Sequence, residues 1–172
     1  MSGQVTLPGI QLPRPKRHSD ESRRATALAL LPDVQRWLNE PATRVEDSIA
    51  QMMSALQSCG SDLDGYRLAR ALEQTHGWDP DAELVEILAD ADFQADRIYE
   101  AEMKDWVLNN SVVLEHRLCA AVNIPTLSHV HCGSWKVTSR RDEVARYGVC
   151  HPGMRCGEEY IVDAENVFAA EP

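Results

Sequence analysis

Histidine and cysteine residues gather at two places in the last third of the 172-residue chain. The two groups are His129, His131 and Cys132, and Cys150, His151 and Cys156. Imidazole and thiolate are the ligands that Zn²⁺ prefers, and a structural zinc site takes four of them in a tetrahedron. The spacing is unusual, since five residues separate the last two cysteines. We therefore expect no resident cofactor and keep zinc, held by His129, His131, Cys132, Cys150 and Cys156, as the alternative; otherwise the cysteines pack as small apolar residues.

The same residues could form a nucleophilic site. Either Cys132 or Cys150 would pair with one of the nearby histidines, and Asp163 would orient the pair. No oxyanion loop or nucleophile elbow accompanies them in the sequence, and neither GxxxxGK[ST] nor GxGxxG occurs. We expect that the protein is not an enzyme.

A third group of residues could contact nucleic acid. It combines positive charge with a ring that could stack on a base, and its members are Trp135, Lys136, Arg140, Arg141 and Arg146, with Tyr147 and Arg155 beside them. Residues 123–172 nevertheless hold five basic and seven acidic residues, for a net charge of -2. Nucleic-acid sites are normally visibly basic, so direct binding of this kind is the less favoured interpretation.

The strongest charge feature is acidic. The whole chain carries a net charge of -10, and residues 73–105 alone supply -9 of it, from eleven acids against two bases. Such a local field favours a basic partner and repels phosphates. The predicted partner-binding residues are eight acids and two tryptophans expected to be exposed: Asp79, Asp81, Glu83, Glu86, Asp90, Asp92, Asp96, Glu100, Trp78 and Trp106. The other interpretation is a solubilising surface.

Composition narrows the class of protein. The chain is 44% hydrophobic and 26% charged, as in soluble globular proteins. It has no run of 18 apolar residues, so no membrane span is expected, and the first twenty residues lack the apolar core of a secretory signal. Five cysteines are an odd number and too few for a disulfide scaffold. These features predict a cytoplasmic protein with reduced thiols.

Helix signals fill the first two thirds of the chain. Residues 1–18 hold three prolines and no periodic pattern, which predicts a flexible tail. Ser19 is a predicted helix cap, and Pro32 is predicted to break that helix before a short turn that ends at Pro41. Apolar residues at helical spacing predict a second helix that stops at Gly60: Val45, Ile49, Met52, Met53 and Leu56.

Three further helices are predicted. One begins at Asp62 or Asp64 and ends at Gly77, and the next begins with Asp79 as its cap and Pro80 as its first residue. The third starts near Ala91 and places Ala95, Tyr99, Met103 and Trp106 on one face. The stretch SVVLEHRLCAAV is ambiguous between helix and strand, and we favour helix.

After Pro125 the pattern changes to short segments rich in β-branched and aromatic residues. The predicted strands are LSHVHC, SWKVTSR, RYGVCH and EEYIV, followed by a single helical turn and a last strand at Val167 and Phe168. The predicted fold class is α+β, in which a helical bundle precedes a small antiparallel β-barrel of the Src-homology-3 or Tudor type. The predicted divisions are a tail at 1–18, an acidic helical domain at 19–122 and a β domain at 126–168.

Parts of residues 76–168 resemble short accessory proteins encoded by phages and prophages of Gram-negative bacteria. The stretches that carry the resemblance are HGWDPDAELVEIL, AEMKDWVLNN, WKVTSRRDEVARYGVCHPG and EYIVDAENV. Those proteins also combine an acidic helical half with a compact strand-rich end. The resemblance implies a mobile-element accessory protein, and it brings no site residue with it.

These features favour a non-enzymatic, phage- or prophage-encoded binding protein that inhibits or redirects a host complex. A host-defence machine such as a CRISPR effector, a ribonucleoprotein with a basic nucleic-acid channel, is a natural target for an acidic surface, so anti-CRISPR activity is the sharpest form of the hypothesis. One alternative is a nucleic-acid-binding accessory factor that acts through the β domain and is stabilised by zinc. Another is a phage assembly protein that forms homo-oligomers through its helices.

Overall fold

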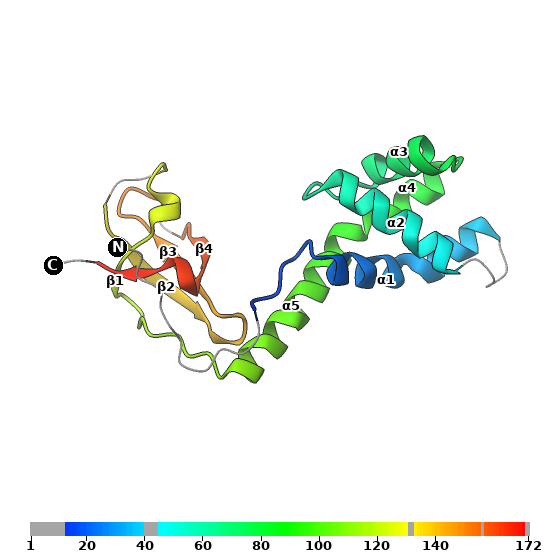
Figure 1. Cartoon of the computed structure of the whole chain (residues 1–172). Coiled ribbons are helices and arrows are strands. Elements are labelled where there is room, and N and C mark those ends of the chain that lie inside the picture. The colour runs from blue at the N-terminus through cyan, green and yellow to red at the C-terminus, as the bar shows by residue number, and fades with distance from the viewer. Residues whose placement is uncertain (1–12, 40–44, 131–132, 156, 171–172) are drawn as a thin grey trace. The chain divides into compact units, whose positions relative to one another are not determined.

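The computed structural model describes residues 13–39, 45–130, 133–155 and 157–170. They belong to two compact units (Figure 1). The helical unit is Pro15–Glu102, and the sheet unit combines Met103–Pro172 with Met1–Arg14. The division lies within a helix, whereas the change in sequence pattern suggests a boundary at 123–127. Together the units make an α+β protein, as predicted.

Five helices run from Asp20 to Asn110 in the described residues. Their bounds are α1 Asp20–Leu38, α2 Val45–Cys59, α3 Gly65–His76, α4 Ala82–Ala89 and α5 Ala91–Asn110. The core of the helical unit is formed by apolar residues at helical spacing, among them Leu30, Ile49, Met52, Leu72 and Leu84, each at most 4% exposed. The predicted stops at Gly60 and Gly77 are confirmed, because both glycines have positive φ angles of 65° and 70°.

Helix α1 passes straight through Pro32, so the predicted break is wrong. A proline leaves the carbonyl of the residue four positions earlier without its helical partner. That residue is Leu28, and since Leu28 and Pro32 are both exposed, the unpaired carbonyl lies on the solvent side. Leu30 and Val34 are buried on the other side, and their packing holds the helix together across the proline.

Helix α4 begins two residues later than predicted. The side chain of Asp81, not Asp79, accepts a hydrogen bond from the backbone N–H of Leu84 at 3.0 Å. Asp81 also accepts from the indole nitrogen of Trp37 at 2.9 Å. The second contact comes from α1, so the local sequence gives no sign of it.

Helix α5 buries the predicted face, since Ala95, Tyr99, Met103 and Trp106 are each at most 9% exposed. The helix ends before Ser111, whose φ of 51° is left-handed. Residues 112–120 are not helical, and the helix favoured for SVVLEHRLCAAV is wrong. Val112 and Val113 are β-branched, which lowers their helix propensity, and the stretch instead leads into β1, Ala121–Asn123.

The sheet unit contains five antiparallel strands in the order β4-β3-β2-β1-β5. The remaining strands are β2 Trp135–Arg141, β3 Arg146–Cys150, β4 Tyr160–Asp163 and β5 Phe168–Ala169. A short 3-10 helix, Ala164–Asn166, precedes β5, which matches the predicted helical turn before the last strand. The described part of LSHVHC, residues 127–130, is not a strand, and β1 takes its place in the sheet. The sheet is open, with β4 and β5 at its two edges.

The core of the sheet unit follows the alternation along its strands. Trp135 and Val137 of β2 are each 1% exposed, as is Tyr147 of β3, while Val149 is 0% exposed. The Tyr147 hydroxyl accepts a hydrogen bond from the backbone N–H of His116 at 2.8 Å, which ties the segment after α5 to the sheet. Within the described residues, no helix combines the length and the apolar character that a membrane span requires.

Candidate functional site

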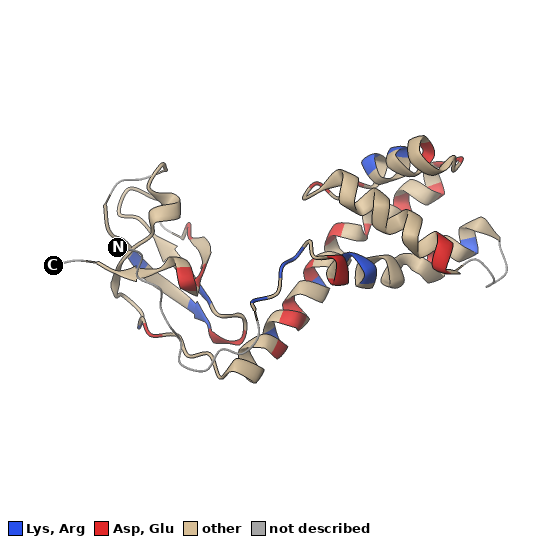
Figure 2. Ribbon diagram, viewed as in Figure 1, with Lys and Arg blue, Asp and Glu red and all other residues tan. Residues whose placement is uncertain are grey.

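The predicted partner-binding acids lie on the surface of α4 and α5 in the helical unit (Figure 2). Five of them are exposed and form no ion pair with another described residue: Asp79, Glu83, Glu86, Asp90 and Glu100. Glu83, Glu86 and Asp90 are spaced by three and four residues, so they share one side of α4 and its C-terminal cap. We call the eight predicted acids from Asp79 to Glu100 the acidic face.

Two acids of this face are already paired with a base. The guanidinium of Arg17 lies 2.6 Å from Asp92 and 2.8 Å from Asp96, which are one turn apart on α5. His18 follows directly, and burial, with the neighbouring charges of Arg17 and Arg23, lowers its pKa. His18 therefore stays neutral at pH 7 and adds no positive charge. The acidic face accordingly accepts a planar guanidinium in this geometry.

Asp81 has a structural role within the acidic face. Its carboxylate caps α4, and the hydrogen bond from the Leu84 N–H, followed by that from the Trp37 indole, holds its pKa below the ordinary value. Both donors are fixed by the fold. Asp81 thus links the start of α4 to Trp37, whose ring stacks on Trp78.

Trp78 lies against Trp37, with the two rings stacked at 5.9 Å between centroids. Its indole nitrogen donates to the side-chain oxygen of Gln51 at 2.5 Å, and the ring is half-buried. Both tryptophans line a mostly polar hollow of about 370 Å³, together with the acids Asp47 and Asp79. The hollow combines negative charge with aromatic surface, the two features that attract a cationic side chain.

Trp106 does not belong to the surface of the helical unit. It is only 8% exposed and lies in the sheet unit. The expectation that this ring is exposed is therefore wrong. The reason is local: Trp106 continues the apolar face of α5, and Arg14 covers its ring at 5.5 Å from the centroid.

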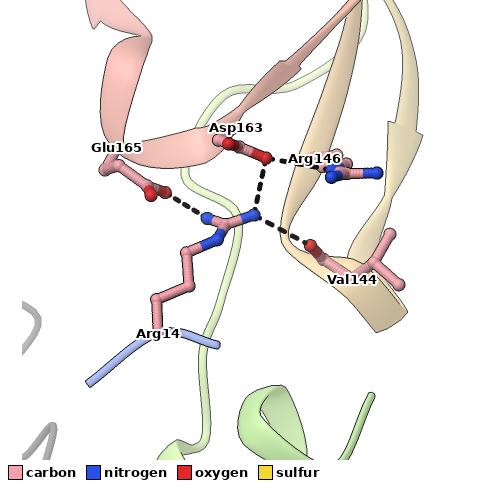
Figure 3. Close-up of polar contacts among 5 residues, drawn as sticks. All are labelled: Arg14, Val144, Arg146, Asp163 and Glu165. Carbon is pink, nitrogen blue, oxygen red and sulfur yellow. Dashed lines mark hydrogen bonds and ion pairs between the residues drawn. The ribbon is translucent and has the colours of Figure 1, made fainter. Parts of the chain in front are cut away.

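Arg14 is the centre of a second acidic site, which lies in the sheet unit (Figure 3). Its guanidinium donates to Asp163 at 2.7 Å and also forms an ion pair with Glu165. The carbonyl of Val144 accepts a longer hydrogen bond of 3.4 Å. Asp163 in addition pairs with Arg146 at 2.9 Å. We call Arg14 with its acceptors and Trp106 the Arg14 site.

An apolar pocket of about 230 Å³ adjoins the Arg14 site. Arg14, Trp106 and Glu165 line it on the polar side, and the remaining wall is largely apolar: Val112, Val113, Leu114, Ala145, Tyr147, Ala164 and Val167, with Glu115 and His116. Val113 is 68% exposed at this pocket. Small-molecule sites usually measure about 300–1,000 Å³, so the space suits one or two side chains better than a cofactor.

The residues predicted for nucleic-acid contact are not arranged for stacking. Trp135 and Tyr147 are each 1% exposed, so neither ring can receive a base in this structure. Arg140 pairs with Asp142 at 2.5 Å, and Arg146 pairs with Asp163. Lys136 and Arg141 are exposed.

Three of the predicted zinc ligands lie outside the described residues: His131, Cys132 and Cys156. His129 is exposed, and Cys150 is a half-buried free thiol. His151 packs edge-on against Trp135 at 5.3 Å and accepts from the Gly153 N–H. Among the described residues, no three metal-ligating side chains come together. Asp163, the predicted orienting acid, is engaged by two arginines.

The sequence prediction missed Arg14 and Arg17 as site residues. A signal was present, because residues 1–20 carry three basic residues and one acid beside a strongly acidic chain. No pattern shows which acids they would meet, since Arg14 and Asp163 are 149 residues apart in the chain.

In comparisons with known proteins, no family model, no curated protein and no solved structure matches this chain.

Proposed function

We propose that the protein is a non-enzymatic binding protein whose acidic face docks on a basic surface of a partner protein. The observation that carries the proposal is the set of five exposed acids on and around α4 and α5, none of which forms an ion pair with another described residue. The set continues into the hollow beside Trp37 and Trp78. In this arrangement the acids steer a basic partner, and the hollow receives one of its lysine or arginine side chains.

The pairing of Arg17 with Asp92 and Asp96 supports this proposal. It is an internal example of an arginine held between two acids of the face. Such contacts on an exposed surface are individually weak, on the order of 0–1 kcal/mol, so affinity requires several of them together with an aromatic anchor.

The proposed target is a host complex with a basic nucleic-acid channel, and the proposed source is a phage or prophage, as the resemblance implies. An acidic face that occupies such a channel competes with phosphates for the same lysines and arginines. Inhibition of a host-defence ribonucleoprotein, anti-CRISPR activity included, is the most specific form of this proposal.

Affinity capture from a Gram-negative bacterial lysate tests the proposal. The bait is the full chain, the salt is about 50 mM, where charge interactions are weakly screened, and the recovered proteins are identified by mass spectrometry. We expect the wild-type chain to enrich a basic protein. The triple variant Glu83→Gln, Glu86→Gln, Asp90→Asn should lose it.

A matched control separates this face from total charge. Glu21→Gln, Asp33→Asn and Asp62→Asn neutralise three exposed acids elsewhere on the helical unit, so that both triple variants have the same net charge. The control should capture the partner as the wild type does. Equal loss in both variants, or retention in the first, would overturn the proposed role of the acidic face.

We further infer that the sheet unit follows the plan of a small Src-homology-3 or Tudor-type barrel. The support is that β1 pairs with both β2 and β5 and that a 3-10 turn precedes β5. Because β4 and β5 are the edges of an open sheet here, the test is whether these two strands contact each other in an experimental structure. Contacts between β4 and β5 would bear the inference out, and edge strands that stay apart would refute it.

A further inference from the structure

We propose that the Arg14 site is a peptide-binding site, which takes an arginine and an adjacent apolar side chain from an extended segment of a partner protein. In the structure the chain's own Arg14 occupies the arginine position. Binding of the partner then requires that the Arg14 side chain and its segment, residues 13–16, leave the site. This site lies in the sheet unit and shares no residue with the acidic face, so the two proposals can fail separately.

The polar side of the site is built for a guanidinium. The acids Asp163 and Glu165 and the Val144 carbonyl accept from the two terminal nitrogens of Arg14, and the Trp106 ring lies beneath its planar carbon. A lysine ammonium is a single point charge and cannot satisfy acceptors placed on two sides of a plane. The geometry therefore selects arginine.

The apolar pocket shows that Arg14 does not fill the site. About 230 Å³ remains open beside it, lined by valines, Leu114 and Tyr147. Val113 is largely exposed at this pocket, although it is β-branched and apolar. A ligand that supplies an apolar side chain next to its arginine would cover this surface, which Arg14 alone leaves open.

The resident segment is held by side chains rather than by a sheet. Residues 13–16 belong to no strand, and Pro13 and Pro15 lack backbone N–H groups and favour extended backbone at Arg14. The Arg14 side chain is 15% exposed, whereas Glu165 is 51% exposed. The pair is thus open to solvent at one side, where a competing arginine can enter.

A tethered arginine competes strongly. A short linker produces an effective concentration on the order of millimolar, so a free peptide of ordinary affinity cannot displace Arg14 from the wild-type chain at micromolar concentration. Removal of the Arg14 side chain should unmask the site.

The test is fluorescence polarisation with a labelled peptide of the chain's own residues 10–18, IQLPRPKRH. The full chain is used as wild type and as Arg14→Ala. We expect the variant to bind the peptide at least about tenfold more tightly than the wild type does. A peptide in which the arginine between the two prolines is replaced by lysine should bind several-fold more weakly to the variant.

Two further variants locate the binding. Glu165→Gln in the Arg14→Ala background should weaken the peptide several-fold, because it removes one charged acceptor. Arg36→Ala is the matched control, since it removes an exposed arginine of α1 and leaves the Arg14 site occupied; it should behave as the wild type. Circular dichroism checks that each chain is folded, and Arg14→Met, which retains the aliphatic stem, replaces Arg14→Ala if the latter unfolds.

Equal peptide affinity for the wild type and the folded Arg14 variant would overturn the proposal and leave Arg14 as a structural contact only. Equal binding of the arginine and lysine peptides would overturn its selectivity. The capture experiment with the acidic-face variants is unaffected by either result.

Discussion

At two places in the described residues a single arginine joins two acids. Arg14 joins Asp163 and Glu165 in the sheet unit, and Arg17 joins Asp92 and Asp96 in the helical unit. Both acceptor sets are pairs of carboxylates close enough to share one guanidinium. The same residue chemistry thus occurs in both units.

Two substitutions of Asp81 distinguish its role as a helix cap from the effect of its charge. Asp81→Ala should lower the melting temperature measured by circular dichroism, because the Leu84 N–H loses its cap. Asp81→Asn should retain most of the stability, since asparagine caps as well as aspartate does. A drop of equal size in both variants would show that charge, and not the cap, is what matters.

The pH dependence of this cap follows from its pKa. Because the folded-state pKa of Asp81 lies below its ordinary value of 3.8, the stability that depends on its negative charge is fully present above pH 3.8 and is lost as the pH falls through the folded-state pKa. The difference in melting temperature between wild type and Asp81→Ala should therefore narrow in acid, by the part of the cap's stabilisation that depends on the negative charge. A difference that does not narrow as the pH falls through the folded-state pKa would contradict this.

At the scale of elements, the sequence pattern predicts the features that depend on residues close together in the chain. The faces of α2 and α5, the stops at Gly60 and Gly77 and three of the strands follow from periodicity and turn residues. The errors arise where tertiary packing overrides a local signal. Packing of the buried residues Leu30 and Val34 keeps α1 helical across Pro32. The segment after α5 contacts Tyr147 and does not form a helix.

Pro32 should reduce the stability of α1. Pro32→Ala restores a backbone donor inside the helix, and the gain is partly offset by a more flexible unfolded chain. We expect a net stabilisation on the order of 2 kcal/mol, visible as a higher urea midpoint. A lower midpoint would mean that the helix needs the proline.

Gly65 should be intolerant of a side chain. A Cβ at this position would overlap the Val85 carbonyl oxygen and lie 2.7 Å from the Ala89 nitrogen, so α3 and α4 could not keep their close approach. Gly65→Ala should destabilise the protein by about 1–3 kcal/mol, as measured by urea unfolding. Gly153→Ala is the control, since its nearest neighbour is 3.4 Å away, and it should change stability little.

For the candidate sites, the sequence predicts the acids but not the arginines that pair with them. The acidic stretch is visible as eleven acids in residues 73–105, and its exposed members lie where helical spacing puts them. The pairings with Arg14 and Arg17 depend on contacts far apart in the chain, which spacing cannot reveal. Trp106, expected on the surface, is buried because the same face of α5 that packs inward includes it.

At the scale of the whole molecule, the acids that produce the net charge of -10 are unevenly distributed. Some of the acids are neutralised by Arg14 and Arg17, and others are exposed on the acidic face. Recognition should therefore depend on ionic strength and on a few identifiable acids, not on total charge.

The most direct measurement is the affinity for the captured partner as a function of salt, for the wild type and for the Glu83→Gln, Glu86→Gln, Asp90→Asn variant. Between about 50 and 500 mM salt, the distance over which exposed charges interact shrinks severalfold. Wild-type affinity should fall steeply over this range, and the variant should bind more weakly at low salt with a flatter dependence on salt. Identical affinities and slopes for the two chains would contradict this expectation.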